Sequence, residues 1–205
     1  MDKLTEDEKL TLNSYNNVAS AWAKNHDTQN FWGKNLEVFH KLLPKGKILE
    51  IGCGSGRDAQ DLISLGYDYI GTDVSVGQLT EARKNNPSGI FKEQSVYSLD
   101  FIDSFDGFWA AAVLIHVPKS RITEALQAIK KNMKKRALGF IAMKEGEGEK
   151  VEERPELDNS RFLFTYWDRG EFRSILKENN FISLHEDYIP MSERTKWLTY
   201  IVRSS

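Results

Sequence analysis

Three closely spaced glycines occupy the stretch KILEIGCGSGRD, residues 47–58. The composition predicts a short apolar strand before them and a helix after them. In a strand–loop–helix unit, backbone N–H groups and the positive helix N-terminus can approach a ligand. Gly52, Gly54 and Gly56 suit such a loop because glycine adopts positive φ and has no Cβ to block the approach. The stretch therefore predicts a ligand site at the carboxyl end of the first strand.

A candidate ribose-binding carboxylate follows the glycine stretch. Asp73 stands 21 residues beyond Gly52, at the end of a second predicted strand over residues 69–72. A carboxylate in that place can accept hydrogen bonds from ribose hydroxyls. The glycines are spaced G-x-G-x-G behind Glu50, whereas the dehydrogenase fingerprint is G-x-G-x-x-G. The pattern predicts a cofactor that contains a nucleoside and leaves open which one, and glycine-rich turns also occur as plain connectors.

The longer strings EIGCGSG (residues 50–56) and TDVS (residues 72–75) resemble the first two motifs of the class I S-adenosylmethionine-dependent methyltransferases. The resemblance implies S-adenosylmethionine as cofactor, with Glu50 orienting its methionine amino end and Asp73 binding the ribose hydroxyls. A lead-in segment, residues 15–22, also resembles the family, in which such a helix lies over the cofactor. The implied cofactor-binding residues are Tyr15, Glu50, Gly52, Cys53, Gly54, Gly56, Asp73, Val74, Ser95 and Val96.

The resemblance covers most of the chain and implies a doubly wound, mostly parallel seven-stranded sheet with a C-terminal antiparallel hairpin. At 205 residues the chain is most simply one domain. We expect four parts: an N-terminal helical lid (1–45), a cofactor-binding core (46–143), a substrate-side loop (144–167), and a C-terminal helix and strand pair (168–205).

Hydrophobic periodicity predicts the remaining elements. Helices are expected over residues 5–24 and near 30–43, and after an N-cap at Ser75. The apolar run 105–114 predicts a central strand that is buried on both faces. Pro118 predicts the start of the following helix. Glycines, Pro155 and six glutamates predict a loop between residues 144 and 166.

The methyl acceptor is less clearly indicated. His116 follows the fourth predicted strand, where ligands gather in open α/β sheets, so it is a candidate general base or substrate hydrogen-bond donor. It is equally a candidate structural histidine that fixes its loop. If the substrate is small, we expect the N-terminal helix and residues 144–167 to close the pocket. The candidate substrate-binding residues are Trp22, Lys144, Glu145, Tyr166 and Trp167, and the aromatic ones could instead pack in the core.

Some chemistries find no support in the sequence. The stretch after the fourth strand lacks the Asn/Asp-Pro-Pro-aromatic signature of enzymes that methylate exocyclic amines of bases. The single cysteine, Cys53, belongs to the glycine loop and is no separate nucleophile. Four scattered histidines predict no metal site. A methyl group on a sulfonium is already activated, so direct in-line transfer needs alignment and exclusion of water.

Composition sets the remaining expectations. The sequence is 40% hydrophobic and 28% charged, as in ordinary globular proteins. No run approaches the roughly 18 apolar residues of a membrane span, so we expect no membrane partner. A single cysteine cannot form an internal disulfide, so the sequence predicts a cytoplasmic enzyme. Its net charge of −2 favours a small-molecule substrate over nucleic acid. The alternatives are an RNA or tRNA methyltransferase, supported by basic residues within 130–136, and a regulatory protein that binds S-adenosylmethionine without transfer. The oligomeric state stays open.

Overall fold

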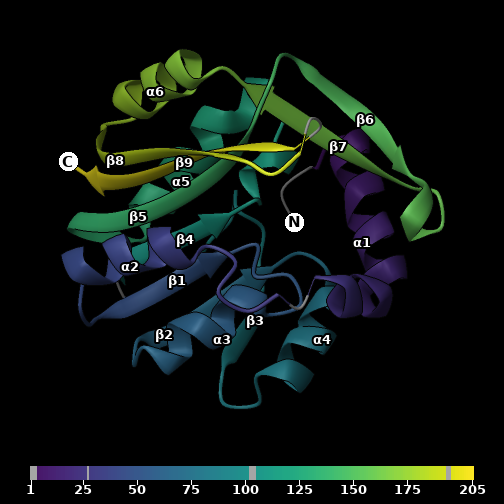
Figure 1. Ribbon diagram of the computed structural model, residues 1–205, viewed down its shortest axis with the longest axis horizontal. Coiled ribbons are helices and arrows are strands. Elements are labelled where there is room, and N and C mark those ends of the chain that lie inside the picture. Colours follow the sequence, from purple (N-terminus) through teal and green to yellow (C-terminus); the bar gives the residue numbers. More distant parts are fainter. Residues whose placement is uncertain (1–3, 27, 102–104, 193–194) are drawn as a thin grey trace.

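The computed structural model describes residues 4–26, 28–101, 105–192 and 195–205, and in this part of the chain nine strands form one sheet (Figure 1). The helices are α1 Glu6–Asn25, α2 Gly33–Leu42, α3 Arg57–Ser64, α4 Val76–Asn85, α5 Ile122–Lys131 and α6 Arg169–Glu178. The strands are β1 Lys47–Ile51, β2 Asp68–Asp73, β3 Ile90–Glu93, β4 Phe105–Ala111, β5 Met133–Glu145, β6 Glu149–Arg154, β7 Ser160–Trp167, β8 Phe181–Pro190 and β9 Lys196–Ser204. Three short 3-10 turns are η1 Leu114–His116, η2 Lys119–Arg121 and η3 Pro155–Leu157.

Seven of these strands confirm the predicted sheet. Strands β3, β2, β1, β4 and β5 are parallel in that order, β9 pairs with β5 antiparallel, and β8 pairs with β9. Helices cover both faces of the sheet. On one face, Trp32 at the start of α2 packs on Phe140 of β5. On the other face, Phe172 of α6 packs on Tyr200, which pairs with Ile141, and successive side chains of a strand point to opposite faces. The strand order reverses between β1 and β4, which places a ligand crevice at their carboxyl ends.

The segment predicted as a substrate-side loop is instead a β-hairpin. Strands β6 and β7 pair antiparallel from Glu149↔Thr165 to Arg154↔Ser160. The prediction was wrong because β6 reads EKVEER, and its charges mask the strand pattern. Charged side chains are common on edge strands, where they discourage pairing with another chain. The apolar residues that bury the hairpin all come from β7, where Phe162, Leu163 and Phe164 are buried.

Helix α1 fastens this hairpin to the rest of the fold. Strand β7 extends the main sheet only at the pairs Lys144↔Tyr166 and Glu145↔Trp167. On its other edge, the Leu163 N–H donates to Thr11 Oγ1 at 2.8 Å, and Ser14 Oγ donates to the Arg161 carbonyl at 2.7 Å. Two hydroxyls of α1 therefore occupy backbone positions that another strand would take. The lid helix and the hairpin form one cover over the carboxyl edge of the sheet (Figure 1).

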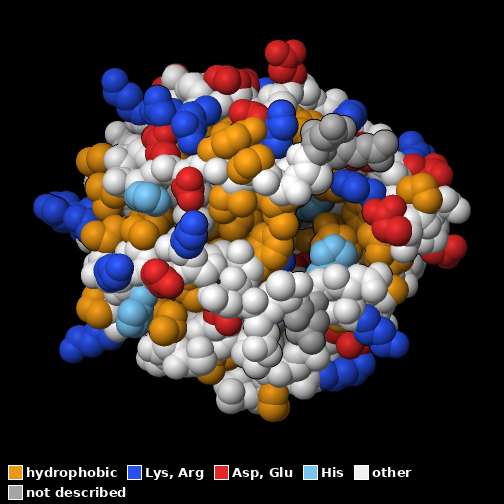
Figure 2. Space-filling view, in the orientation of Figure 1, with side chains coloured by type: hydrophobic (Ala, Val, Ile, Leu, Met, Phe, Trp, Pro, Cys, Tyr) orange, Lys and Arg blue, Asp and Glu red, His pale blue; other side chains and the backbone are white. Residues whose placement is uncertain are grey.

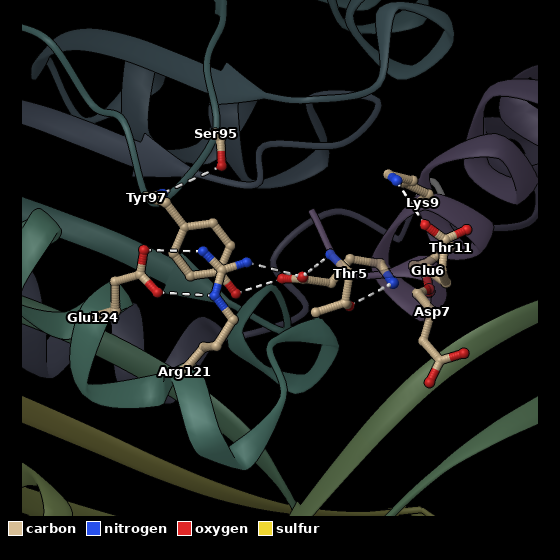
Figure 3. A network of polar contacts seen from close by, with 10 residues as sticks. Thr5, Glu6, Asp7, Lys9, Thr11, Ser95, Tyr97, Arg121 and Glu124 are labelled. Carbon is tan, nitrogen blue, oxygen red and sulfur yellow. Dashed lines mark hydrogen bonds and ion pairs between the residues drawn. The ribbon is translucent and has the colours of Figure 1, made fainter. Parts of the chain in front are cut away.

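The start of α1 is anchored by a polar network (Figure 3). The predicted helix over 5–24 is confirmed, and it begins with a capping box between Thr5 and Glu8. The buried Glu8 carboxylate also accepts hydrogen bonds from Tyr97 and, at 3.0 Å, from Arg121. The Arg121 guanidinium in turn holds Glu124. These contacts join the lid to the loop after β3 and to η2.

Three smaller predictions need correction. Strand β4 ends at Ala111 rather than residue 114, because Ala112 takes a φ of +59° and turns the chain into η1. Pro118 precedes the 3-10 turn η2, and α5 begins only at Ile122. The basic residues 134–136 lie in β5, not at the end of a helix. By contrast, the cap predicted at Ser75 is confirmed. Asp168 and Glu171 form a capping box at the start of α6.

Across the described residues, we find no helix that is both long enough and apolar enough to span a membrane.

The α1–hairpin contact makes a prediction about stability. Thr11→Val keeps the shape of the side chain but leaves the buried Leu163 N–H without an acceptor, which should lower the free energy of unfolding by about 1–3 kcal/mol. Chemical denaturation measures the loss. Thr80→Val is the matched control, since Thr80 is exposed and its hydroxyl bonds only the Val76 carbonyl of its own helix. Equal stability of the two variants would show that the hydroxyl does not fasten the hairpin.

Candidate functional site

A cavity of ≈ 200 Å³ lies at the carboxyl ends of β1, β2 and β4, beneath α1. Eleven of the predicted site residues line it, and five do not. Those that line it are Tyr15, Trp22, Glu50, Gly52, Cys53, Gly54, Asp73, Val74, Ser95, Val96 and His116. Those outside it are Gly56, Lys144, Glu145, Tyr166 and Trp167.

The glycine loop fits the conformation that its sequence predicts. Gly52 has a φ of +67°, and a Cβ there would lie 2.3 Å from the Val113 side chain, so no larger residue fits. Gly54, with a φ of +53°, directs its N–H to Asp73 Oδ2 at 2.9 Å. Gly56 does not line the cavity. Its carbonyl accepts a hydrogen bond from Asn86 Nδ2 at 2.8 Å, and this contact holds the loop against the end of α4.

Asp73 stands at the end of β2 and joins two loops. Its second oxygen, Oδ1, accepts the Ser75 N–H at 2.8 Å. Burial raises the pKa of this carboxyl, while the N–H groups of Ser75 and Gly54 act in the opposite direction. Each carboxylate oxygen has two lone pairs and uses one of them on the backbone. Asp73 can therefore still accept hydrogen bonds from two hydroxyls of a ligand in the cavity.

Two buried carboxylates flank the glycine loop. Glu50 is 3% exposed and accepts a hydrogen bond from Tyr69, and Asp58 is 5% exposed and accepts from Trp109 Nε1 at 3.0 Å. Burial, and then the negative charge of Asp58, raise the pKa of Glu50 well above its usual range. Arg57 Nε lies 2.5 Å from Asp58 and compensates only one of the two acids. This end of the cavity favours a cationic group and opposes a diphosphate.

Asp58 and Arg57 were not among the predicted site residues, although both line the cavity. The available signal was local, because the two residues follow the glycine loop directly and occupy the first turn of α3. Residues there point toward a ligand held at the helix N-terminus. The sequence did not show that Asp58 would be buried beside Glu50, since that depends on Trp109 in β4.

His116 is fully engaged by protein groups. Its Nδ1 lies 2.6 Å from the Leu163 carbonyl, so Nδ1 carries the proton and donates it. Its Nε2, 2.9 Å from the Tyr15 hydroxyl, is then the acceptor. Burial, aided by the positive charges of Lys144 and Arg154, lowers the pKa of His116 to about 4. The imidazole is thus neutral near pH 7 and links η1, α1 and β7, as expected of the structural histidine.

A second imidazole in the cavity, His26, has a free nitrogen. Its Nδ1 lies 3.0 Å from the Trp22 carbonyl and donates to it, and its ring stacks on Trp22 with 3.6 Å between centroids. Nε2 has no hydrogen-bond partner among the described residues. Burial lowers the pKa of His26. Sequence reasoning missed this residue because it stands just beyond the last turn of α1, with no motif around it.

Gln78 is the other cavity residue that the sequence did not suggest. Its side chain, in the first turn of α4, is 2% exposed. Neither the amide oxygen nor the amide nitrogen has a hydrogen-bond partner among the described residues. A buried amide without partners is costly, and one that lines a cavity is best satisfied by a polar ligand. Gln78 lies beside the glycine loop, at 3.8 Å from where a Cβ on Gly54 would stand.

The remaining predicted substrate residues separate into two groups. Trp22 lines the cavity and meets Tyr15 edge-to-face, with centroids 5.1 Å apart. Trp167 is 2% exposed and packs on Phe172 of α6, so it belongs to the core on the opposite face. Glu145 accepts from Tyr188 at the edge of the sheet. Lys144 and Tyr166 lie at the hairpin, outside the cavity lining.

The described residues contain no group of three or more His, Cys, Asp or Glu side chains that could hold a metal ion.

The chain resembles known proteins across the region that builds this cavity. Residues 48–136 match a protein family described as a methyltransferase domain, and this range contains the glycine loop, Asp73 and His116. This match agrees with the resemblance of its motifs to the class I S-adenosylmethionine-dependent methyltransferases, a resemblance that implies S-adenosylmethionine as cofactor.

One curated relative is the probable S-adenosyl-L-methionine-dependent methyltransferase TehB of Haemophilus influenzae, 24% identical over 136 residues, which are 64% of this chain and 47% of TehB. This chain thus matches about half the length of that relative. A DhpI–SAH complex is similar over 99% of both chains, with a TM-score of 0.78 and 16% identity. The 1,6-didemethyltoxoflavin-N1-methyltransferase of Burkholderia thailandensis has a TM-score of 0.69 and 16% identity, over 100% of this chain and 93% of its own. The two solved structures confirm the methyltransferase fold.

His116 provides a prediction about how the stability of the protein depends on pH. Its folded-state pKa of about 4 lies below the ordinary value of about 6.5. Between these values the unfolded chain binds a proton that the folded protein excludes, so the stability contribution is complete above pH 6.5. It is lost as the pH falls toward 4, by roughly 3 kcal/mol in the free energy of unfolding. His116→Gln should reduce this loss. NMR titration should find the His116 ring neutral down to pH 5, and a midpoint near 6.5 would contradict the assignment.

Gln78 makes a prediction with two opposite effects. Gln78→Leu removes a buried, unpaired amide, so the free protein should be as stable as the wild type or more stable. The same change should weaken binding of S-adenosylhomocysteine by roughly 2- to 10-fold, the worth of one ordinary hydrogen bond. Thermal unfolding and calorimetry measure the two effects. Gln60→Leu, on the exposed face of α3, is the control. Unchanged affinity in Gln78→Leu would remove the amide from the cofactor site.

Proposed function

We propose that this protein is an enzyme that transfers a methyl group from S-adenosylmethionine directly to a small-molecule acceptor. The observation that carries the proposal is the pair of buried carboxylates, Glu50 and Asp58, beside a loop that admits only glycine at residue 52. The cofactor's methionine end carries an ammonium, which these acids would neutralise. A diphosphate in the same place would meet two negative charges at short range.

The cofactor residues follow from the same geometry. Glu50 and Asp58 would hold the amino group, Asp73 the two ribose hydroxyls, and Gln78 a further polar group near the sugar. Val74, Ser95 and Val96 line the part of the cavity nearest β2 and β3, where the adenine would lie. Cys53 contributes its backbone, since burial raises the pKa of its thiol well above the ordinary value. Gly56 acts only indirectly, through its contact with α4.

When bound, S-adenosylmethionine supplies a methyl group that is already activated on a sulfonium. The protein's residues need to orient the acceptor and exclude water. Helix α1 does both, because Tyr15 and Trp22 cover the cavity from above. His116 would position Tyr15 rather than remove a proton, since its lone pair already accepts the Tyr15 hydroxyl. His26 is the imidazole in the cavity whose Nε2 remains open to an acceptor.

Two solved neighbours favour a small acceptor. The Burkholderia thailandensis structure contains bound 1,6-didemethyltoxoflavin and S-adenosylhomocysteine. Another, with a TM-score of 0.71 and 16% identity, is the magnesium protoporphyrin IX methyltransferase of Synechocystis. The cavity beneath α1, lined in part by Tyr15, Trp22 and Tyr97, is of the kind that suits such ligands. With a single cysteine and a net charge of −2, we place the enzyme in the cytoplasm.

The tRNA alternative loses its main support. Its basis was the basic run at 130–136, and residues 134–136 begin β5, whereas the cavity lies at the opposite, carboxyl end of the strands. From Lys134 to Lys144 an extended strand covers roughly 33 Å. Lys134 is also paired with Asp106, at 2.8 Å. A non-catalytic, cofactor-binding regulator would share the same cavity, so only a transfer assay separates it from an enzyme.

Cofactor binding tests the proposal directly. Calorimetry should detect binding of S-adenosylmethionine and S-adenosylhomocysteine and none of NAD. Asp73→Ala should weaken S-adenosylhomocysteine binding by about 10- to 100-fold, because charge-assisted hydrogen bonds to the ribose are lost. Asp68→Ala, a change of the same type at the exposed start of β2, is the control. Binding of NAD without a response to S-adenosylmethionine would refute the proposal. An unchanged affinity in a folded Asp73→Ala would remove that residue from the site.

A further inference from the structure

A buried lysine without a polar partner lies at the carboxyl end of β5. Lys144 is 6% exposed, and its ammonium stands over the Phe164 ring, 3.6 Å from the centroid, and 5.9 Å from that of Tyr166. An ammonium has three N–H donors. Among the described residues, none of these donors meets a hydrogen-bond acceptor or a carboxylate. The aromatic faces compensate the charge only in part, so the site favours a negatively charged ligand atom.

Two further cations surround the same rings and define a basic cluster of Lys144, Lys150 and Arg154. The Arg154 guanidinium lies 4.9 Å from the Phe164 centroid, and the Lys150 ammonium 5.3 Å from that of Tyr166. Two carboxylates contact this cluster. Glu152 accepts the Tyr166 hydroxyl and lies 3.1 Å from Lys150 and 3.5 Å from Arg154, and Glu156 lies 3.7 Å from Arg154. Among the described residues, neither carboxylate forms an ion pair or a hydrogen bond with Lys144.

The basic cluster adjoins the cavity through His116. The His116 ring lies 5.1 Å from the Phe164 ring and bonds Tyr15, which lines the cavity. Figure 2 shows this face of the molecule hollowed beneath the β6–β7 hairpin, with a basic side chain at the rim and histidine inside. The cavity's own acids, Glu50 and Asp58, serve the opposite end and have partners of their own. Because Lys144 lies outside the cavity lining, a ligand whose body rests on Tyr15 would reach it by extending a charged end past His116.

We propose that the methyl acceptor is a small molecule that carries a carboxylate, and that Lys144, assisted by Arg154, binds this carboxylate while Tyr15 and Trp22 hold its apolar body. This rests on the proposed function, since it names the acceptor class of that same site. One lysine without a partner matches a single negative charge, which favours a carboxylate over a phosphate dianion. The placement also accounts for a lysine in β5 that lies against the aromatic residues Phe162 and Phe164 of β7.

The test uses benzoate as probe and benzamide as its neutral isostere. Each is added to protein saturated with S-adenosylhomocysteine, and binding is followed by ligand-detected NMR. Benzoate should bind roughly 10- to 100-fold more tightly than benzamide, the range for a hydrogen bond to a charged group. Lys144→Met should abolish that preference, and Lys144→Arg should retain it. Lys135→Met removes the same charge from an exposed side chain near the start of β5, away from the cluster, and should leave the preference intact.

A measurement on the wild type covers the case in which Lys144→Met does not fold. Burial, and then the charge of Arg154, lower the pKa of Lys144 to about 8, with Glu152 acting oppositely and Lys150 in the same direction. His116 and Tyr166 complete the titratable groups around it. Benzoate stays ionised throughout, so its advantage over benzamide should decline as the pH rises from 7 to 9.

Two outcomes would overturn the assignment: no preference for benzoate at pH 7, or a preference that survives in folded Lys144→Met. Neither outcome contradicts the proposal that the cavity binds S-adenosylmethionine, because S-adenosylhomocysteine binding is measured separately on the same samples. Failure of the proposed function itself would appear as loss of that binding.

Discussion

A single carboxylate organises the loops on which the whole site depends. Asp73 accepts the N–H of Gly54 from the loop after β1 and the N–H of Ser75 from the loop after β2. The Cys53 N–H continues the ladder by donating to the Thr72 carbonyl at 2.9 Å. These bonds within the protein hold the glycine loop in one shape, with its N–H groups tied to β2. Preorganisation of this kind reduces the ordering cost of binding.

The same arrangement extends to the lid. Asn16 of α1 accepts hydrogen bonds from Ser75 Oγ and the Gly77 N–H, so the middle of α1 is attached to the loop that Asp73 shapes. The other attachments of α1 are polar as well, through Glu8 at its start and Thr11 on the hairpin. Neutral hydrogen bonds of this kind contribute about 1 kcal/mol each, and those to a charged group about 1.5–3 kcal/mol. These directional bonds act together with apolar packing, since Val18 and Ala19 of α1 are buried and Tyr15 packs on Phe162.

Charge is divided between the two ends of the site. The glycine-loop end carries three carboxylates, Glu50, Asp58 and Asp73, while the hairpin end carries the basic cluster around Lys144. Between them lies a neutral, aromatic section formed by Tyr15, Trp22 and His116. A cationic cofactor end and an anionic acceptor end would each meet the opposite charge. Electrostatic complementarity would thus orient both reactants along the cavity.

The sequence by itself determined the cofactor half of this protein. The glycine loop, Asp73 at the end of a strand and the N-cap at Ser75 follow from local signals: positive φ, capping and apolar periodicity, whereas the architecture of the sheet was implied by the family resemblance. Each of these signals depends on residues a few positions apart, so neighbouring letters suffice to predict it. Eleven of the sixteen predicted site residues lie at the cavity for this reason.

Only the tertiary structure decided the acceptor half. His116 is bonded at both ring nitrogens because the Leu163 carbonyl, 47 residues away, accepts its Nδ1–H and the Tyr15 hydroxyl donates to its Nε2. Trp167 faces the core and Lys144 the hairpin because β7 adds to β5 at one register, and strand register sets which face each side chain occupies. The unpaired amide of Gln78 and the burial of Asp58 likewise depend on what other elements leave around them. Residues that come together from distant parts of the chain determine which side chains are buried, where a proton sits and which polar groups lack a hydrogen-bond partner. No local sequence pattern encodes these properties.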